Sequence, residues 1–386
     1  MTSSRFVAAE LAAVFVALAI IAWASPEPDR VTDRDVYENT AARIIVPDCA
    51  DLHCFRVLVP WVLGRLPGPS TLRWKGYAAL SNAAAAVAVF TLCLTFGLSR
   101  RAASMASVVS AFGFGSLYTL HDPYTSDPLM FFAGPFITNE LFQGRLALAA
   151  LAGTVGVFAK EFAAAPFYIL AAYHGVERRW GPALRSLAAG NLAFLVWLLL
   201  TLTLMLKFNY GWGGTDSSNL ASGAGIGPWL RRMSPRGIAA AMFNEFGALY
   251  VLVPVGFFLA PRHVRLLTIA SVPVAAALVY LQQPDRALWN LHFLAAPLAA
   301  TVLDGVPVAL AGATLAAFAV GNLRVGAQLP IAPLGRAALA LSVVLAAASA
   351  WTALRAARGR LTRDSIIRPD DVPRAPSQDA PAHVGL

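Results

Sequence analysis

Residues 76–98 read GYAALSNAAAAVAVFTLCLTFGL, and the cations Arg100 and Arg101 follow almost at once. The run contains no Asp, Glu, Lys or Arg, and about 20 such residues suffice for a helix to cross the hydrocarbon core of a bilayer. Only helices and closed barrels satisfy their backbone groups in lipid, and the chain lacks the period-2 alternation of barrel strands. The stretch therefore predicts a membrane-spanning helix with a basic flank.

The rest of the chain repeats this pattern. Of its 386 residues, 58% are hydrophobic and only 13% charged, and the mean hydropathy is +0.61. This composition excludes a water-soluble globular domain. We predict an all-α polytopic membrane helix bundle of about 10 to 12 segments, some of them re-entrant or half-length, forming a single transmembrane domain over residues 1–363. The predicted segments are 6–24, 76–98, 102–120, 128–138, 146–159, 162–173, 187–206, 246–260, 266–281, 288–303, 306–320 and 337–354.

The short basic clusters between the spans predict orientation, because cytoplasmic loops are enriched in Lys and Arg. If the clusters at 99–101, 177–185, 262–265 and 355–363 are cytoplasmic, both termini are cytoplasmic as well. The net charge of +9 then follows from membrane topology and does not indicate nucleic-acid binding. Arg145 and Arg178 then share a side, so the chain between them crosses twice or not at all. Two crossings place Lys160 and Glu161 at an outer turn. The alternatives are a cytoplasm-facing hairpin, or a buried Lys160–Glu161 ion pair that locks two helices.

Several segments lie outside the core of the bundle. The first apolar run is longer than a usual signal-peptide core, which favours an uncleaved anchor over a cleaved signal. Extracytoplasmic loops are expected at 25–75 and 207–245. Within the first loop, the amphipathic stretch 55–65 predicts a helix along the membrane interface, with its Arg and Trp side chains at headgroup depth. The proline-containing tail 364–386 is expected to be a disordered cytoplasmic segment.

Two cysteines share the first loop, Cys49 and Cys54. In an oxidising compartment they can form a disulfide, which would shape the loop more than stabilise the fold because the closed ring is short. They can also remain free thiols. A third alternative is a metal site that includes Asp48, Asp51 and His53, although the spacing matches no common zinc pattern.

Ionisable residues in the predicted outer loops are the candidates for chemistry. Carboxylates near a low-dielectric boundary can act as general bases, and nearby Lys or Arg can hold a phosphate. The charged residues of any one loop could simply form solvent-exposed surface. A functional site is indicated because several such loops are predicted on the same side of the membrane. The candidates are Asp33, Asp35 and Tyr37 after the first span, Asp122 and Asp127 after the third, the Lys160–Glu161 turn, and Asp285 with Arg286.

The order of these features resembles bacterial integral-membrane glycosyltransferases of the GT-C superfamily, which use a polyprenyl-phosphate sugar donor on the extracytoplasmic face. The matching stretches are Asp35-x-Tyr37, FRVLVP at 55–60, Lys160-Glu161, and Asp285-Arg286 ahead of LHFLAAP at 291–297. The resemblance implies a protein of the bacterial inner membrane that transfers a hexose or pentose with inversion. Asp35 is the expected general base, with Asp33 as second choice.

The resemblance also assigns substrate contacts, and each assignment has a structural alternative. Lys160 and Arg286 would bind the donor phosphate, or form ion pairs with Glu161 and Asp285. Asp33 and Asp35 would serve the acceptor, or cap a helix that starts near Val36. The remaining expected substrate contacts are Tyr37, Arg56, Asp122, Asp127, and the cations Arg231 and Arg232, which contact a lipid phosphate or ordinary headgroups.

The partners expected on this basis are a polyprenyl-phosphate-linked sugar, membrane lipids and a glycan, lipid or protein acceptor, with no nucleic acid. No cofactor and no metal ligand are assigned, although Asp33-x-Asp35 leaves a divalent cation open. Two other functions fit the same residues. A transporter or lipid flippase would line its pathway with them, and a noncatalytic assembly factor of the cell envelope would use them only for structure.

Overall fold

A computed structural model describes residues 4–28, 33–211, 236, 243, 246–281 and 288–366 of the chain. All regular structure in these ranges is helical, which confirms the predicted all-α class. Seven helical segments of the described residues are long and apolar enough to cross a membrane, with Arg100–His121 counted as one segment. Three further apolar helices are shorter, Leu146–Gly156, Leu249–Leu259 and His292–Asp304, as the sequence predicted for part of the bundle.

The described helices follow the predicted order. They are α1 (Ser4–Ala24), α2 (Arg34–Arg43), η1 (Leu52–Phe55), α3 (Leu58–Leu63), α4 (Ser70–Thr95), α5 (Arg100–Ala111), α6 (Phe114–His121), α7 (Asp127–Phe142), α8 (Leu146–Gly156), η2 (Glu161–Ala164), α9 (Ala165–Val176), α10 (Trp180–Phe208), α13 (Leu249–Leu259), α14 (Arg262–Leu281), α16 (His292–Asp304), α17 (Val308–Val325) and α18 (Ala332–Ile366). Each of the twelve predicted segments overlaps a helix or, in the case of 102–120, the consecutive helices α5 and α6.

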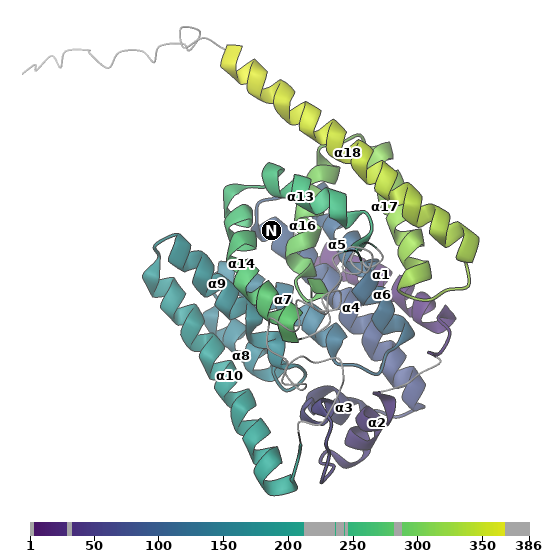
Figure 1. Ribbon diagram of the computed structural model, residues 1–386, viewed down its shortest axis with the longest axis vertical. Coiled ribbons are helices and arrows are strands. Elements are labelled where there is room, and N and C mark those ends of the chain that lie inside the picture. Colours follow the sequence, from purple (N-terminus) through teal and green to yellow (C-terminus); the bar gives the residue numbers. More distant parts are fainter. Residues whose placement is uncertain are drawn as a thin grey trace, which may run out of the picture.

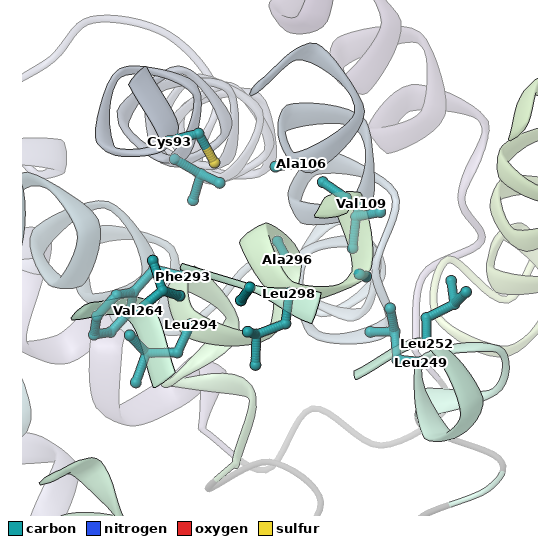
Figure 2. Packing of buried hydrophobic residues seen from close by; sticks show 14 of the residues in the cluster. Cys93, Ala106, Val109, Leu249, Leu252, Val264, Phe293, Leu294, Ala296 and Leu298 are labelled. Carbon is teal, nitrogen blue, oxygen red and sulfur yellow. The ribbon is translucent and has the colours of Figure 1, made fainter. Parts of the chain in front are cut away.

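Helix α4 lies in the interior of the bundle. Six of its thirteen buried residues are alanine, and small side chains let neighbouring membrane helices approach closely. Figure 2 shows Cys93 of α4 and Val109 of α5 in one apolar cluster with Leu249 of α13 and Phe293 and Leu298 of α16. This cluster joins both halves of the chain.

The short helices α13 and α16 pack with almost no space between their backbones. A Cβ atom added to Gly256 of α13 would lie 2.0 Å from the carbonyl oxygen of Leu298 in α16. Glycine at this position therefore sets the separation of the two helices, because any side chain would collide with backbone rather than with a movable group.

Three of the four predicted cytoplasmic clusters meet at one end of the bundle. Contacts connect the chain segments around residues 99, 177 and 262 with one another or with the segment around residue 304. The contacts are Ser99 Oγ to Asp304 Oδ2 (2.9 Å), Arg101 Nη2 to the Val306 carbonyl (2.7 Å), His263 Nε2 to the Phe96 carbonyl (3.0 Å) and Arg262 Nη1 to Glu177 Oε1 (3.1 Å). Helix α18 extends beyond the rest of the bundle (Figure 1).

The first-loop helices α2, η1 and α3 lie together at the other end of the bundle, beside the end of α10 (Figure 1). A disulfide joins Cys49 to Cys54 across η1, so of the three alternatives for these cysteines the structure contains the disulfide. The backbone N–H of Asp48 donates to the carbonyl of Phe208, and that of Gly211 donates to the carbonyl of Cys49. These bonds attach the disulfide-closed loop to the end of α10.

Candidate functional site

Two buried ion pairs lie beneath the first-loop helices. Lys160 Nζ binds Asp127 Oδ1, and Arg56 Nη2 donates to Glu161 Oε1 at 3.0 Å. The cationic side chains are only 4% and 8% exposed, respectively. Four of the predicted site residues, from three separate parts of the chain, are thus brought together in one cluster.

Local structure explains how the four charges meet. Asp127 is the first residue of α7, where a carboxylate is favoured by the helix dipole. Lys160 and Glu161 occupy the connection between α8 and α9, and the backbone bond from Leu58 N–H to the Phe158 carbonyl holds this connection against α3. Arg56 stands between η1 and α3 and points into the same space.

The structure adds detail to one sequence-based prediction and contradicts one alternative. The guanidinium of Arg56 is buried inside the protein against Glu161, whereas Trp61 of the same segment is 42% exposed. The alternative in which Lys160 pairs with Glu161 is wrong, since each residue takes a partner from a distant segment instead. Adjacent residues on extended backbone point in different directions, and the Lys160 backbone is extended at φ −159°.

Burial and pairing act against each other on these groups. Burial raises the pKa of Glu161, but the charge and hydrogen bond of Arg56, together with the charge of Lys160, hold the pKa below its ordinary value. Burial lowers the pKa of Lys160, and the attraction of Asp127 offsets this only in part. For Arg56, burial lowers the pKa, but the charge and hydrogen bond of Glu161, together with Tyr37 and Asp127, raise it overall. Glu161 and Arg56 therefore stay charged at neutral pH.

A second cluster of polar residues, His53 with Asp51 and Asp33, lies in the first loop. His53 stands between two carboxylates, with Nδ1 2.7 Å from Asp51 Oδ1 and Nε2 3.4 Å from Asp33 Oδ2. The Asp51 carboxylate also accepts the backbone N–H of His53 at 2.8 Å. Burial would raise the pKa of Asp51, but these bonds from His53 lower it overall. The Cys49–Cys54 disulfide encloses the short segment that carries Asp51 and His53.

The two candidate bases differ in where they point. Tyr37 of α2 is fully buried, and Asp33 lies one helical turn before it, on the inward side. Asp35 is displaced from Tyr37 by about 200° around the helix and is exposed. Asp33 stands at the N-cap position, but among the described residues its carboxylate accepts no capping hydrogen bond. The helix-capping alternative is therefore not what the structure contains for Asp33.

Tyr37 forms the buried floor of the site. Its ring packs 5.4 Å from Trp74 and 5.7 Å from His53, centroid to centroid. Ser126 Oγ, next to Asp127 in sequence, lies 3.5 Å from the Tyr37 hydroxyl. Tyr37 therefore lies between His53 and the start of α7, where Asp127 is paired with Lys160.

The other predicted residues fall in different places. Asp122 directly follows α6 and is half-buried, next to His121, whose Nδ1 lies 2.8 Å from the Pro26 carbonyl oxygen. Arg231, Arg232, Asp285 and Arg286 lie outside the described residues. Sequence reasoning missed His53 as a partner of Asp33. The only local signal was Asp51 two residues before it, and nothing in the spacing indicated Asp33.

An apolar groove opens between α13, α14 and α16. Its volume is about 710 Å³, and the described residues that line it include no Asp, Glu, Lys or Arg. Tyr250, Thr268 and Ser271 are its polar members. Val279 and Leu288 both line the groove, and the chain between them includes Arg286.

No family model matches the chain, and no curated protein matches it. Among solved structures it is similar to the oligosaccharyltransferase of Archaeoglobus fulgidus. The apo crystal structure gives a TM-score of 0.49 at 12% identity, covering 88% of this chain and 56% of that one. The form tethered with an acceptor peptide gives 0.47 at 12%, covering 88% and 55%, and AglB with an inhibitory peptide and a dolichol-phosphate gives 0.48 at 13%, covering 86% and 56%. The chain spans about half the length of these archaeal proteins.

Proposed function

We propose that this chain is a membrane glycosyltransferase that moves a sugar from a polyprenyl-phosphate donor to a hydroxyl acceptor. The observation that carries the proposal is the meeting of Asp33, His53 and Asp51 above the buried Arg56–Glu161 and Lys160–Asp127 pairs. These residues lie in the first loop and in later segments. The order of those segments along the chain carries the resemblance to GT-C glycosyltransferases. A carboxylate held in this way is suited to general-base chemistry.

In the proposed reaction, Asp33 accepts the proton of the acceptor hydroxyl. The freed oxygen attacks the anomeric carbon, and the bond from that carbon to the donor phosphate oxygen breaks, so polyprenyl phosphate leaves with the electron pair and the configuration inverts. His53 orients the Asp33 carboxylate through its Nε2, while its Nδ1 is fixed by Asp51. Asp33 is preferred to Asp35 because it faces His53 and the buried floor, whereas Asp35 is exposed.

The donor has two parts that need separate surfaces. Its polyprenyl chain fits the apolar groove between α13, α14 and α16, where charged lining is absent among the described residues. For the phosphate we propose Arg286, which lies in the chain between two residues of that groove. Lys160 is proposed as a positioning residue instead, because Asp127 already binds its ammonium group.

The test compares Asp33→Asn with Asp35→Asn in purified protein in liposomes, supplied with synthetic polyprenyl-phosphate hexoses and pentoses. The measurement is release of polyprenyl phosphate. We expect Asp33→Asn to lower turnover by about 10² to 10⁴ with unchanged thermal unfolding, whereas the exposed Asp35→Asn retains activity. Full activity in Asp33→Asn, or loss only in Asp35→Asn, would remove Asp33 as the base.

The same liposomes separate the enzyme from its main rival. A flippase would move the intact donor to the other leaflet, where a sugar-binding lectin would detect it, without releasing polyprenyl phosphate. We expect release that depends on added acceptor and no such movement. Movement without release would replace transfer by transport.

A further inference from the structure

A second cavity lies at the far end of α7 from Asp127. It has a volume of about 740 Å³, within the range of sites for small ligands, and is bounded by residues of α1, α4, α5 and α7 together with Arg145. Thirteen residues at 1.5 Å per residue separate Asp127 from Glu140, so the two sites are about 20 Å apart along the helix. The cavity is at the end where the basic clusters meet.

The polar wall of this cavity is built by a buried carboxylate. Glu140 is 4% exposed and accepts from Arg145 Nη1 at 3.2 Å and from Asn139 Nδ2 at 3.0 Å. Thr95 Oγ1 in turn donates to Asn139 Oδ1 at 2.7 Å. Glu140 thereby holds Arg145 at the rim, where its side chain is 59% exposed, and the exposed Arg100 is the second cation of the lining.

The opposite wall is apolar and follows the helices into the bundle. Val87 and Ala88 of α4 and Phe132 and Phe136 of α7 are among its residues. The cavity thus has an apolar part along the helices and a rim with two cations and one anion, a net charge of +1 from Arg100, Arg145 and Glu140. This combination differs from the groove between α13, α14 and α16, whose described lining carries no charge.

We propose that this cavity binds one anionic glycerophospholipid from the membrane leaflet at the basic end of the protein. The single negative charge of a phosphatidylglycerol headgroup balances the net +1 of the rim, and an acyl chain covers the apolar wall. Basic pockets between membrane helices suit anionic lipid headgroups in general. A free phosphate compound would use only the rim and leave the apolar wall open, so the lipid is the better match to both parts.

The test is native mass spectrometry of the full chain released from nanodiscs of equal phosphatidylglycerol and phosphatidylethanolamine. The measurement is the fraction that retains one lipid of each kind. We expect preferential retention of phosphatidylglycerol, and about a fivefold loss in Arg100→Gln, since one surface cation near an anionic lipid is worth about that factor. Arg100→Gln leaves the Glu140–Arg145 pair intact, which separates lipid contact from folding.

A second variant tests the apolar wall independently. Ala84→Leu adds bulk to the cavity lining without changing charge, and we expect it to lower phosphatidylglycerol retention. The matched control is Arg355→Gln in α18, an exposed cation outside the cavity lining, which should retain lipid like the natural protein. Equal retention of both lipids, equal loss in the Arg355 control, or full displacement by glycerol phosphate would each overturn the proposal.

Discussion

Lys160 shows how a single residue can belong to the site without contacting substrate. Its charge is removed from water, and a buried ion pair stabilises only while both partners remain, because one partner alone leaves an uncompensated charge. The sequence presents Lys160 as a donor-phosphate ligand. In the structure its ammonium group is held by Asp127, and the pair fixes the start of α7 against the α8–α9 connection.

We predict that Lys160→Met lowers the free energy of unfolding by about 3 to 5 kcal/mol, because the buried Asp127 carboxylate would lose the cation that compensates its charge. The double variant Lys160→Met with Asp127→Leu should recover most of this loss, since an apolar pair of similar size is often as stable as a buried ion pair. Thermal unfolding in detergent, followed by circular dichroism, measures both. Equal stability of the single and double variants would show that the two residues are not coupled.

The pH dependence of stability should report on Glu161. Its pKa is lower in the folded protein than its ordinary value of 4.5, so its carboxylate stabilises the fold above that value. This contribution is lost as the pH falls through the lowered folded-state pKa. We predict that Glu161→Gln unfolds at a lower temperature than the natural protein at pH 7, and that the difference narrows below about pH 4.

Melting curves of both proteins from pH 7 to pH 3 measure this convergence. Asp35→Asn is the control, because Asp35 is exposed in the same end of the protein. Its melting temperature should follow that of the natural protein throughout. A difference for Glu161→Gln that stays constant with pH would contradict the role of the Arg56–Glu161 pair.

Among the elements, the half-length helices α13 and α16 depend most on close backbone contact. Gly256 approaches the Leu298 carbonyl so closely that a methyl group must push the two helices apart. We predict that Gly256→Ala lowers the free energy of unfolding by about 1 to 3 kcal/mol, the usual range for overpacking. The variant should also disturb the apolar groove, because α13 and α16 form two of its sides.

Gly312→Ala in α17 is the matched control for this prediction. Among the described residues nothing lies within 4 Å of a Cβ atom added there. Alanine is the better helix former, so stability should be unchanged or rise by up to about 1 kcal/mol. Thermal unfolding compares the two variants, and a similar loss at both positions would show that packing at Leu298 is not the cause.

At the scale of the whole molecule, the two ends of the bundle have different chemistry. One end collects the basic clusters, and the other holds the first loop with its disulfide and buried ion pairs. The positive-inside tendency predicts that the basic end faces the cytoplasm. A disulfide is also stable in an oxidising compartment, which agrees with the first loop facing outward.

We predict that a membrane-impermeant maleimide labels a Pro67→Cys variant in intact cells, because this exposed position lies at the first-loop end. A Gly359→Cys variant near the end of α18 should be labelled only after the membrane is permeabilised. Cys93 is buried and Cys49 and Cys54 are bridged, so background labelling should be low. The reverse pattern would invert the orientation and place the proposed active site in the cytoplasm.

Composition and hydrophobic runs predicted much of the fold. The helical class, the order of the twelve segments and the meeting of basic clusters at one end follow from long apolar runs and from the requirement that each span changes sides. These are properties of local sequence and of the bilayer as solvent. Helix ends differ from the prediction by up to 12 residues, at the end of α18, since hydropathy does not fix where the last backbone bond forms.

The sequence indicated which residues are candidates for the site but not how they are arranged. The sequence by itself predicted that Asp33, Arg56 and Asp127, and in one of its alternatives Lys160–Glu161, belong to loops on one side of the bundle. Only the tertiary structure decided that Lys160 pairs with Asp127, that Arg56 pairs with Glu161, and that His53 faces Asp33. These partners are 33, 105 and 20 residues apart in sequence, respectively. Which residues pair with one another depends on how the helices pack and on which charges become buried together. Neither property can be predicted from a local sequence pattern.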